Sequence, residues 1–443
     1  MLIIGARARC MNHNSRRRYQ VPIREPVAVF CYCKARGRAR LSIERSCGAI
    51  TLVEIAAWQG PPAGSLCPSR SAATVFRASE SSVIIPLATT HPESPRSVSR
   101  LSLTASPSLY PIAIERSAQA VQFIQMTEQS YADASFLDSR MLGPDPILEV
   151  RHWEEIRDET ASLVARCHFI FHISHAGSTL LSRLLGCHPQ LFSLREPLIL
   201  RNLADVYLWL DEPACDWTED KFVDRLEVFL KLWSRTYRPD QTSVIKATSF
   251  ASDMGHHLLE SVSTARGMLM YVRPQVFLPA LLGGTRKDIT SLAANRWKRL
   301  QRYLGEEAPT QGLSGLTAGE CVAMSWLTEM LALERAAKFA ERTLWIDFDQ
   351  FLQAPQRALA TCFHHLEIGV SPDFVESLCG SPLMTRYSKA PQHAYDTNFR
   401  ASLLAESAGK HPAEIRQGMR WLATLASQST LVAAVLHRAG TSY

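Results

Sequence analysis

The chain has 443 residues, of which 46% are hydrophobic, and its 48 Lys plus Arg against 42 Asp plus Glu give a formal net charge of +6. At roughly 150 residues per domain, this length corresponds to two or three domains with ample apolar residues for a core, which excludes a wholly disordered or fibrous protein. No window approaches the roughly 18 consecutive apolar residues of a membrane span, so we expect a soluble protein.

The 11 cysteines are scattered along the chain. They form no CxxC pair and no Cys/His cluster at the spacing of a zinc site. We therefore expect reduced thiols, a cytoplasmic location and no bound metal.

The basic charge belongs to the amino-terminal part. Residues 1–125 hold 16 Lys plus Arg against 6 Asp plus Glu, whereas the remainder holds 32 against 36. The same segment lacks helical or strand periodicity and strings Ser, Pro and Arg together, for example at 94–100. This composition predicts a disordered leader over residues 1–125 rather than a packed domain.

Three other interpretations of this leader remain. An Arg-rich, Ser-rich and acid-poor segment is typical of an organelle transit peptide, and the arginines 16–18 are suited to nucleic acid. Alternatively, translation starts further in, for example at Met126. We favour disordered or spurious sequence over a function, and we expect no nucleic-acid partner.

From about residue 140 to 443 the pattern is that of an α/β domain followed by a helical C-terminal extension. Short apolar runs at 169–173, 191–194, 244–245, 268–272 and 344–348 alternate with helix-length patterns, among them 198–210, 222–237 and 321–340. Alternating strands and helices predict a three-layer fold with a central, mainly parallel sheet. In such sheets, ligands bind at the carboxyl ends of the strands.

The first of these strands leads into a turn and a helix whose chemistry favours an anion. Gly177 permits close approach of a ligand, and the following amides and the hydroxyls of Ser178 and Thr179 are donors at a helix amino terminus. The ATPase form of such a loop ends in Gly-Lys-Ser/Thr, and that lysine is missing here. From these residues alone, a capped turn that starts a buried helix stays an equal alternative.

Downstream motifs favour the phosphate cradle. The run 175–185 (His-Ala-Gly-Ser-Thr-Leu-Leu-Ser-Arg-Leu-Leu), then His188-Pro189 and then Glu196-Pro197, resembles the opening of the sulfotransferase family, in particular the branch of tyrosylprotein sulfotransferases and bacterial relatives. The segments 244–248, 268–274 and 344–351 resemble later elements of that family in the same order. The resemblance covers roughly residues 165–400 and implies a P-loop NTPase-like fold.

The resemblance implies 3′-phosphoadenosine 5′-phosphosulfate as co-substrate, with no metal. The loop would then hold the 5′-phosphosulfate, and a later strand ending in arginine would hold the 3′-phosphate. The residues that match the loop are His175, Ala176, Gly177, Ser178, Thr179 and Leu180.

Three charged residues match catalytic or binding positions of the family. Glu196 lies where the resembling branch keeps its catalytic base, although an acid before a proline also suits a helix start. Lys246 would stabilise the leaving group, and its alternative is a lysine that ends an edge strand. Arg273 is expected to bind the 3′-phosphate, because a guanidinium suits a phosphate dianion.

Two positions depart from the family pattern. His175 stands where the family has Lys or Arg, so we expect a cofactor affinity that weakens as pH rises, and we list His175 among the catalytic residues. The family's partner serine for the 3′-phosphate falls on 279–281, which holds no hydroxyl, and Thr285, Arg286 or Lys287 are the candidates to replace it.

Two further basic segments carry weaker signals. The loop 385–391 is interpreted as a lid in which Ser388 and Lys389 contact the cofactor. A second basic group is interpreted as a solvated helix face rather than as a site for an acidic acceptor or for part of the nucleotide. Its members are Arg286, Lys287, Arg296, Lys298, Arg299 and Arg302.

The sequence thus predicts a sulfotransferase that transfers a sulfuryl group to a hydroxyl or amine acceptor. A P-loop nucleotide phosphotransferase is the first alternative, and it would need Asp347 or Asp349 for magnesium. A degenerate module that binds nucleotide without catalysis is the second. The acceptor and the oligomeric state are not encoded in these motifs.

Overall fold

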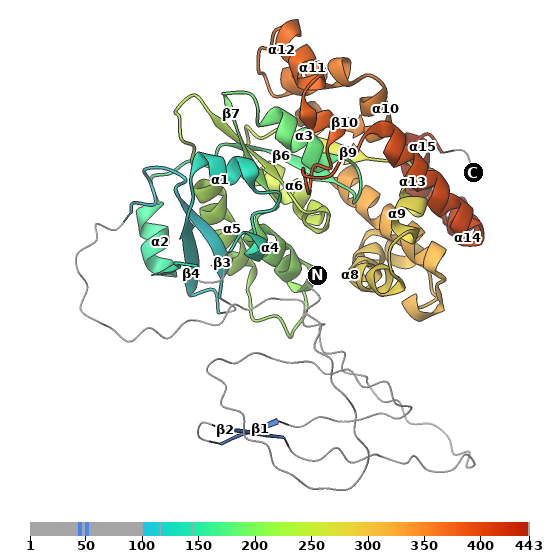
Figure 1. The fold of residues 1–443 in the computed structure, drawn as a ribbon. Coiled ribbons are helices and arrows are strands. Elements are labelled where there is room, and N and C mark those ends of the chain that lie inside the picture. The colour runs from blue at the N-terminus through green and yellow to red at the C-terminus, as the bar shows by residue number, and fades with distance from the viewer. Residues whose placement is uncertain (1–42, 47–48, 53–100, 116, 143–145, 442–443) are drawn as a thin grey trace, which may run out of the picture. The chain divides into compact units, whose positions relative to one another are not determined.

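The computed structural model describes residues 43–46, 49–52, 101–115, 117–142 and 146–441 (Figure 1). The chain divides into two units, Met1–Ser79 and Glu80–Tyr443, which are taken separately. In the first unit the described residues form one antiparallel hairpin of β1 (Ile43–Ser46) and β2 (Ala49–Leu52). The rest of the predicted leader up to residue 100 lies outside the described residues.

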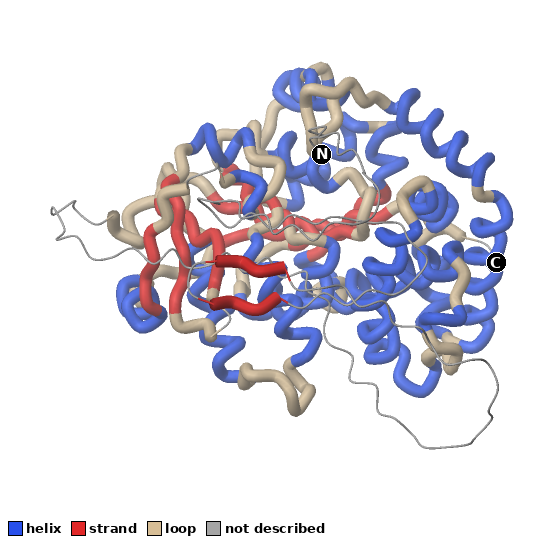
Figure 2. Tube along the Cα trace, turned by 60° about the horizontal axis from the view of Figure 1, so that its bottom comes forward, coloured by secondary structure: helices blue, strands red, loops and turns tan. Residues whose placement is uncertain are grey.

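The second unit is built on a five-stranded sheet in which all neighbouring strands are parallel. The strands, in spatial order, are β10 (Thr343–Asp347), β9 (Gly267–Tyr271), β6 (Cys167–His172), β8 (Thr242–Lys246) and β7 (Leu191–Arg195). The strands β7, β8 and β9 are buried at every residue, as expected for parallel strands covered on both faces. Helices lie on both faces of this sheet (Figure 2), so the predicted α/β class is confirmed.

The strand order places β6 in the centre, between β8 and β9. After β6 the chain runs to β7 at one edge and back to β8, and it then crosses to β9 on the other side of β6. The connections of the neighbouring strands β6 and β8 thus leave in opposite directions, which makes their carboxyl ends the topological switch point where ligands bind in open α/β sheets. The register pairs Arg195 with Lys246, Ile170 with Lys246 and Asp347 with Tyr271. The ends of all five strands thus meet at one edge.

Helices and short helical turns connect and cover these strands. Between β6 and β9 they are α3 (Ser178–Leu185), α4 (Leu198–Trp209), α5 (Glu219–Trp233), η2 (Ser249–Met254) and α6 (Gly255–Ser261). Between β9 and β10 they are α7 (Pro274–Leu282), α8 (Arg286–Leu304), η3 (Gly305–Glu307), η4 (Leu313–Gly315), α9 (Ala318–Ala336) and η5 (Ala340–Arg342).

More helices follow β10. They are α10 (Phe348–Gln353), α11 (Pro355–His365), α12 (Pro372–Cys379), η6 (Pro382–Thr385), α13 (Thr397–Lys410), α14 (Pro412–Gln428) and α15 (Thr430–Arg438). Within the described ranges, none of the helices combines the length and the apolarity that crossing a membrane requires.

A three-stranded antiparallel sheet precedes the parallel one, and it corrects the predicted leader boundary. Its strands are β3 (Leu109–Ile114), β4 (Ala120–Gln125) and β5 (Glu149–His152), with α1 (Glu128–Asp133), η1 (Ser139–Met141) and α2 (Trp153–Glu159) beside them in the chain. Leu103, Tyr110, Ile112 and Phe123 are buried in the core. Disorder over 101–125 was therefore a wrong prediction, and a chain that started at Met126 would lack β3 and β4.

Two buried arginines hold this amino-terminal sheet to the rest of the domain. Arg235 donates to the carbonyl oxygens of Leu103 at 2.9 Å and Leu109 at 2.8 Å. Arg195 donates to the carbonyl oxygen of Ala134 at 2.6 Å, just beyond α1. Burial of a guanidinium is costly unless its N–H groups are satisfied, so these carbonyls fix where the sheet packs.

The predicted solvated face on α8 is also corrected. Arg296 and Arg299 are 4% and 0% exposed and both bind the buried Glu329 of α9. Lys298 is more exposed and pairs with Glu212 at 2.6 Å. Periodic charge on a helix looks the same in sequence whether the partner is water or a buried carboxylate, which explains the error.

Candidate active site

The loop between β6 and α3 leads into the amino terminus of α3. Gly177 caps α3 in a left-handed conformation with φ of 69°, and His175 has a φ of 60°. Ser178 and Thr179 are 5% and 3% exposed, and the hydroxyl oxygen of Thr179 finds no hydrogen-bond partner among the described residues. Donors at this position are suited to an anion.

Gly177 is required on two grounds. A side chain is strained at its φ, and a Cβ atom built there would lie 2.0 Å from the ring of Phe348. Phe348 begins α10, so the close approach also packs the end of β10 against the loop. The sequence predicted the need for glycine, and the structure adds the aromatic contact.

Glu196 and Lys246 form an ion pair at the ends of the neighbouring strands β7 and β8. The side chain of Lys246 is 1% exposed and that of Glu196 is 15% exposed. The backbone N–H of Glu196, at a φ of 51°, donates to the carbonyl oxygen of Lys246 at 2.7 Å. Glu196 and Lys246, which are 50 positions apart in the sequence, are therefore joined by a side-chain ion pair and by a backbone hydrogen bond.

Burial and charge act against each other in this pair. Burial lowers the pKa of Lys246 to about 8, although Glu196 opposes the shift. Burial alone would raise the pKa of Glu196, but the charge of Lys246 and the hydrogen bond from its ammonium bring this pKa below its usual range. Glu196 is thus a carboxylate at neutral pH, and Lys246 is close to its titration point.

His172, at the end of β6, was not predicted from the sequence. Its ring nitrogens lie 2.8 Å from the carbonyl oxygen of Ile173 and 2.9 Å from that of Ala247, so it joins the start of the loop to the residue after Lys246. Burial, together with Lys246, lowers its pKa to about 3, so the ring is neutral and donates to only one of these two carbonyl oxygens. The only indication of His172 in the sequence was that it is a polar residue within the apolar run 169–173.

His175 lies in the loop, where it was predicted to carry partial charge. Loss of hydration in the loop and the charges of Lys389 and Arg400 lower the pKa of His175, although the residue is exposed. The ring is therefore mainly neutral at pH 7, so it can donate a hydrogen bond but brings little net charge.

The loop that carries Lys389 is tied to α3. Arg183 donates to the carbonyl oxygen of Ser388 at 2.9 Å and to the carbonyl oxygens of Ala132 and Asp133 at 3.1 and 3.2 Å. The positive charge of Lys389 contributes to the lowered pKa of Lys246. Ser388 contributes its backbone carbonyl to this anchor, and the predicted lid motion stays a prediction.

Arg273 lies on the other side of β6, directly after β9. Its side chain is 44% exposed, and Nε is 3.4 Å from Oδ2 of Asp347. An open hollow of about 480 Å³ adjoins it, lined by Arg273, Val276, Asp347, Asp349, Gln350, Gln353 and Ala354. Arg273 is thus accessible to a ligand, but next to a carboxylate.

The stretch 279–281, on which the family's partner serine falls, lies within α7, and both Pro279 and Leu281 are buried. Thr285 is exposed next to Gly284, after α7, and the side chains of Arg286 and Lys287 lie outside the described residues. A replacement for that serine stays a prediction.

No family model and no curated protein matches the chain. Matching solved structures include the sulfotransferase domain from the curacin biosynthetic pathway, which is 14% identical over 63% of this chain and 99% of that one, with a TM-score of 0.34. Sulfotransferase STF9 from Mycobacterium avium is 13% identical over 58% and 80%, with a TM-score of 0.32.

A third match is mouse sulfotransferase SULT7A1 complexed with PAP, 12% identical over 64% of this chain and 94% of that one, with a TM-score of 0.33. All three structures are sulfotransferases.

Replacement of Gly177 by alanine is expected to destabilise the protein. The left-handed backbone alone costs a non-glycine residue about 1–2 kcal/mol, and the contact with Phe348 adds to it. Urea unfolding of Gly177→Ala should show at least this loss. Gly369→Ala is the matched control, because nothing lies within 4 Å of its added Cβ, and equal stability of both variants would contradict the argument.

Affinity for adenosine 3′,5′-bisphosphate is expected to fall as pH rises above about 8. The pKa of Lys246 is about 8 in the free chain, and a bound anion raises it, so binding takes up a proton above that pH. The ligand's phosphates, with a second pKa of about 6, and His175 no longer titrate there. Calorimetry at pH 7 to 9.5 should show the decline for wild type and a flat, weaker profile for Lys246→Met. A flat wild-type profile would contradict it.

Proposed function

We propose that this protein transfers a sulfuryl group from 3′-phosphoadenosine 5′-phosphosulfate to a hydroxyl or amine acceptor. The observation that carries the proposal is the Glu196–Lys246 pair at the strand ends beside a phosphate cradle without the ATPase lysine. A carboxylate and a buried ammonium next to an anion site are the groups that this transfer needs.

The residues that would hold the nucleotide lie in two places. The loop residues 175–180 offer backbone N–H groups and hydroxyls to the 5′-phosphosulfate, and the unpaired hydroxyl of Thr179 fits such a ligand. Arg273 would hold the 3′-phosphate from the hollow beyond β9. Lys389 adds positive charge on the side of Glu196.

The nucleotide supplies the sulfuryl group and departs as the bisphosphate. Sulfuryl transfer resembles phosphoryl transfer, in which positioning and neutralisation of the leaving group do most of the work. Lys246 would stabilise charge on the departing phosphate oxygen, and Glu196 would accept the proton of the acceptor. As Lys246 turns to that oxygen, its ion pair with Glu196 weakens. The pKa of Glu196 then rises, so the carboxylate becomes a stronger base.

The phosphotransferase alternative has less support. It needs a free carboxylate for magnesium, but Asp347 caps α10 and pairs with Arg273, and Asp349 pairs with Arg400 at 2.7 Å. A turnover assay distinguishes an enzyme from a non-catalytic module that only binds nucleotide.

Nucleotide affinity distinguishes a sulfotransferase from a phosphotransferase. Calorimetry on the full chain should show binding of adenosine 3′,5′-bisphosphate, whereas ATP with magnesium should bind much more weakly. Arg273→Ala should lower affinity for the bisphosphate about 10- to 100-fold, since hydrogen bonds between charged groups contribute about 1.5–3 kcal/mol, but leave adenosine 5′-monophosphate unaffected. Arg157→Ala, an exposed arginine of α2 outside the site, is the control. Tighter binding of ATP with magnesium would favour the phosphotransferase.

A turnover assay tests the role of Glu196 as the general base. Bisphosphate release from 3′-phosphoadenosine 5′-phosphosulfate, measured with a panel of phenols, alcohols and amines, should fall at least 100-fold in Glu196→Gln, because general-base catalysis contributes about 10²–10⁴-fold. Bisphosphate affinity should stay within a few-fold of wild type. Unchanged turnover in the variant would remove Glu196 from this role. Nucleotide binding without turnover on any acceptor would favour the non-catalytic module.

A further inference from the structure

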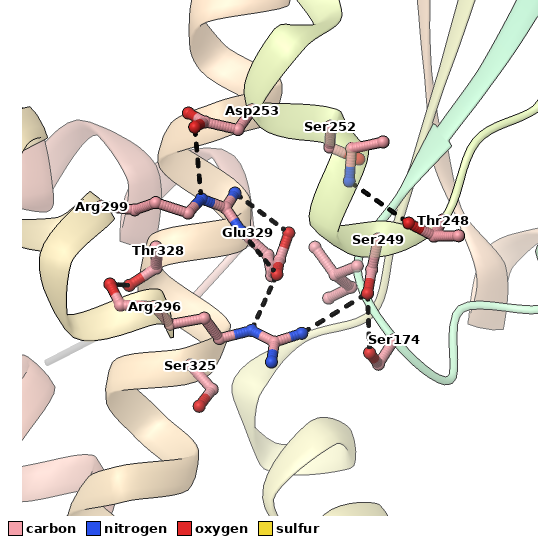
Figure 3. A network of polar contacts seen from close by, with 12 residues as sticks. Ser174, Thr248, Ser249, Ser252, Asp253, Arg296, Arg299, Ser325, Thr328 and Glu329 are labelled. Atoms are coloured by element: carbon pink, nitrogen blue, oxygen red, sulfur yellow. Dashed lines mark hydrogen bonds and ion pairs between the residues drawn. The ribbon is translucent and has the colours of Figure 1, made fainter. Parts of the chain in front are cut away.

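A network of buried charges reaches from the helices α8 and α9 to the phosphate cradle (Figure 3). Its centre is Glu329 of α9, which is fully buried and accepts from Arg296 Nε at 2.7 Å and from Arg299 Nη1 at 3.1 Å. Arg299 in turn lies 3.8 Å from Asp253 of η2. Three segments that are distant in the chain are therefore joined through ionised groups.

One end of this network touches the loop that precedes α3. Arg296 Nη2 donates to the hydroxyl oxygen of Ser249 at 3.4 Å, and that hydroxyl lies 3.2 Å from the hydroxyl of Ser174 (Figure 3). Ser174 is the residue before His175, the non-glycine residue of the loop with a positive φ. Ser249 follows β8 by three residues, on the strand end that carries Lys246.

A buried ion pair fixes the positions of its groups more than it increases the stability of the fold. Apolar residues of similar volume often replace a buried ion pair at no loss of stability, whereas the ion pair defines one geometry. A positive φ at a non-glycine residue costs free energy and persists only where the surroundings hold it. The contact of the Ser174 hydroxyl with Ser249 lies immediately before His175, the residue with the positive φ.

The geometry points to Ser249 and Arg296 as positioning residues for the cradle. Arg296, oriented by Glu329, holds the hydroxyl of Ser249, and Ser249 holds Ser174, so that the loop keeps the backbone conformation that directs its amides at the nucleotide. This inference rests on the proposed function, because the nucleotide is the ligand whose affinity it concerns. None of the three residues needs to touch that nucleotide.

The test is a double-mutant cycle on the full chain with adenosine 3′,5′-bisphosphate as probe. Ser249→Ala and Ser174→Ala should each lower affinity about three- to tenfold, the size of one net hydrogen bond. The double variant should lose no more than either single variant, because both remove the same contact. Melting temperatures should remain close to wild type, since both side chains are partly exposed.

Two further variants separate positioning from a general structural effect. Ser249→Thr keeps the hydroxyl and should restore affinity, whereas Ser402→Ala, on the exposed helix α13, should leave affinity unchanged. Wild-type affinity in Ser249→Ala, or losses that add in the double variant, would overturn the positioning role while the proposed function stands. If wild type itself fails to bind the bisphosphate, the proposed function falls, and this inference with it.

Discussion

The ion pair between Lys246 and Glu196 is the constraint on which the site depends. A lysine that is 1% exposed is tolerated in a protein interior only when a partner offsets the loss of hydration. Glu196 supplies that partner from the end of the neighbouring strand, and its backbone accepts an unusual positive φ to do so. The ends of β7 and β8 are thereby fixed beside the central loop after β6.

Around this pair, the buried Arg195 and Arg235 and the half-buried Arg183 organise the irregular segments. Arg195 donates to a backbone carbonyl oxygen at the end of α1, Arg235 to that of Leu109 in β3, and Arg183 to that of Ser388. Such carbonyls have no regular secondary-structure partner, so a long, forked donor satisfies several of them at once. The loop with Lys389 and the sheet of β3 to β5 are thus held against the parallel sheet by side chains rather than by strand pairing.

The sequence anticipated the parallel strands well, because each is a short apolar run next to a turn. The antiparallel strands β3 and β4 were missed. Their apolar runs are equally short but follow a segment rich in Ser, Pro and Arg. In the structure β4 also pairs with β5, and Arg235 donates to the carbonyl oxygen of Leu109 in β3, so the partners include residues that are distant in the chain. The burial of Arg296 and Arg299 was missed for a related reason, since a charge pattern carries no information about a partner helix.

The sequence by itself determined which chemical groups are present at the strand ends: a loop with Gly177 and two hydroxyls, Glu196, Lys246 and Arg273. Local periodicity and turn chemistry suffice for that, because they depend on neighbours in the chain. Only the tertiary structure decided that Glu196 pairs with Lys246, that His175 is neutral and that Arg273 lies beside Asp347. Strand order, burial and electrostatic neighbours result from contacts between distant segments, and these set both the distances and the pKa values.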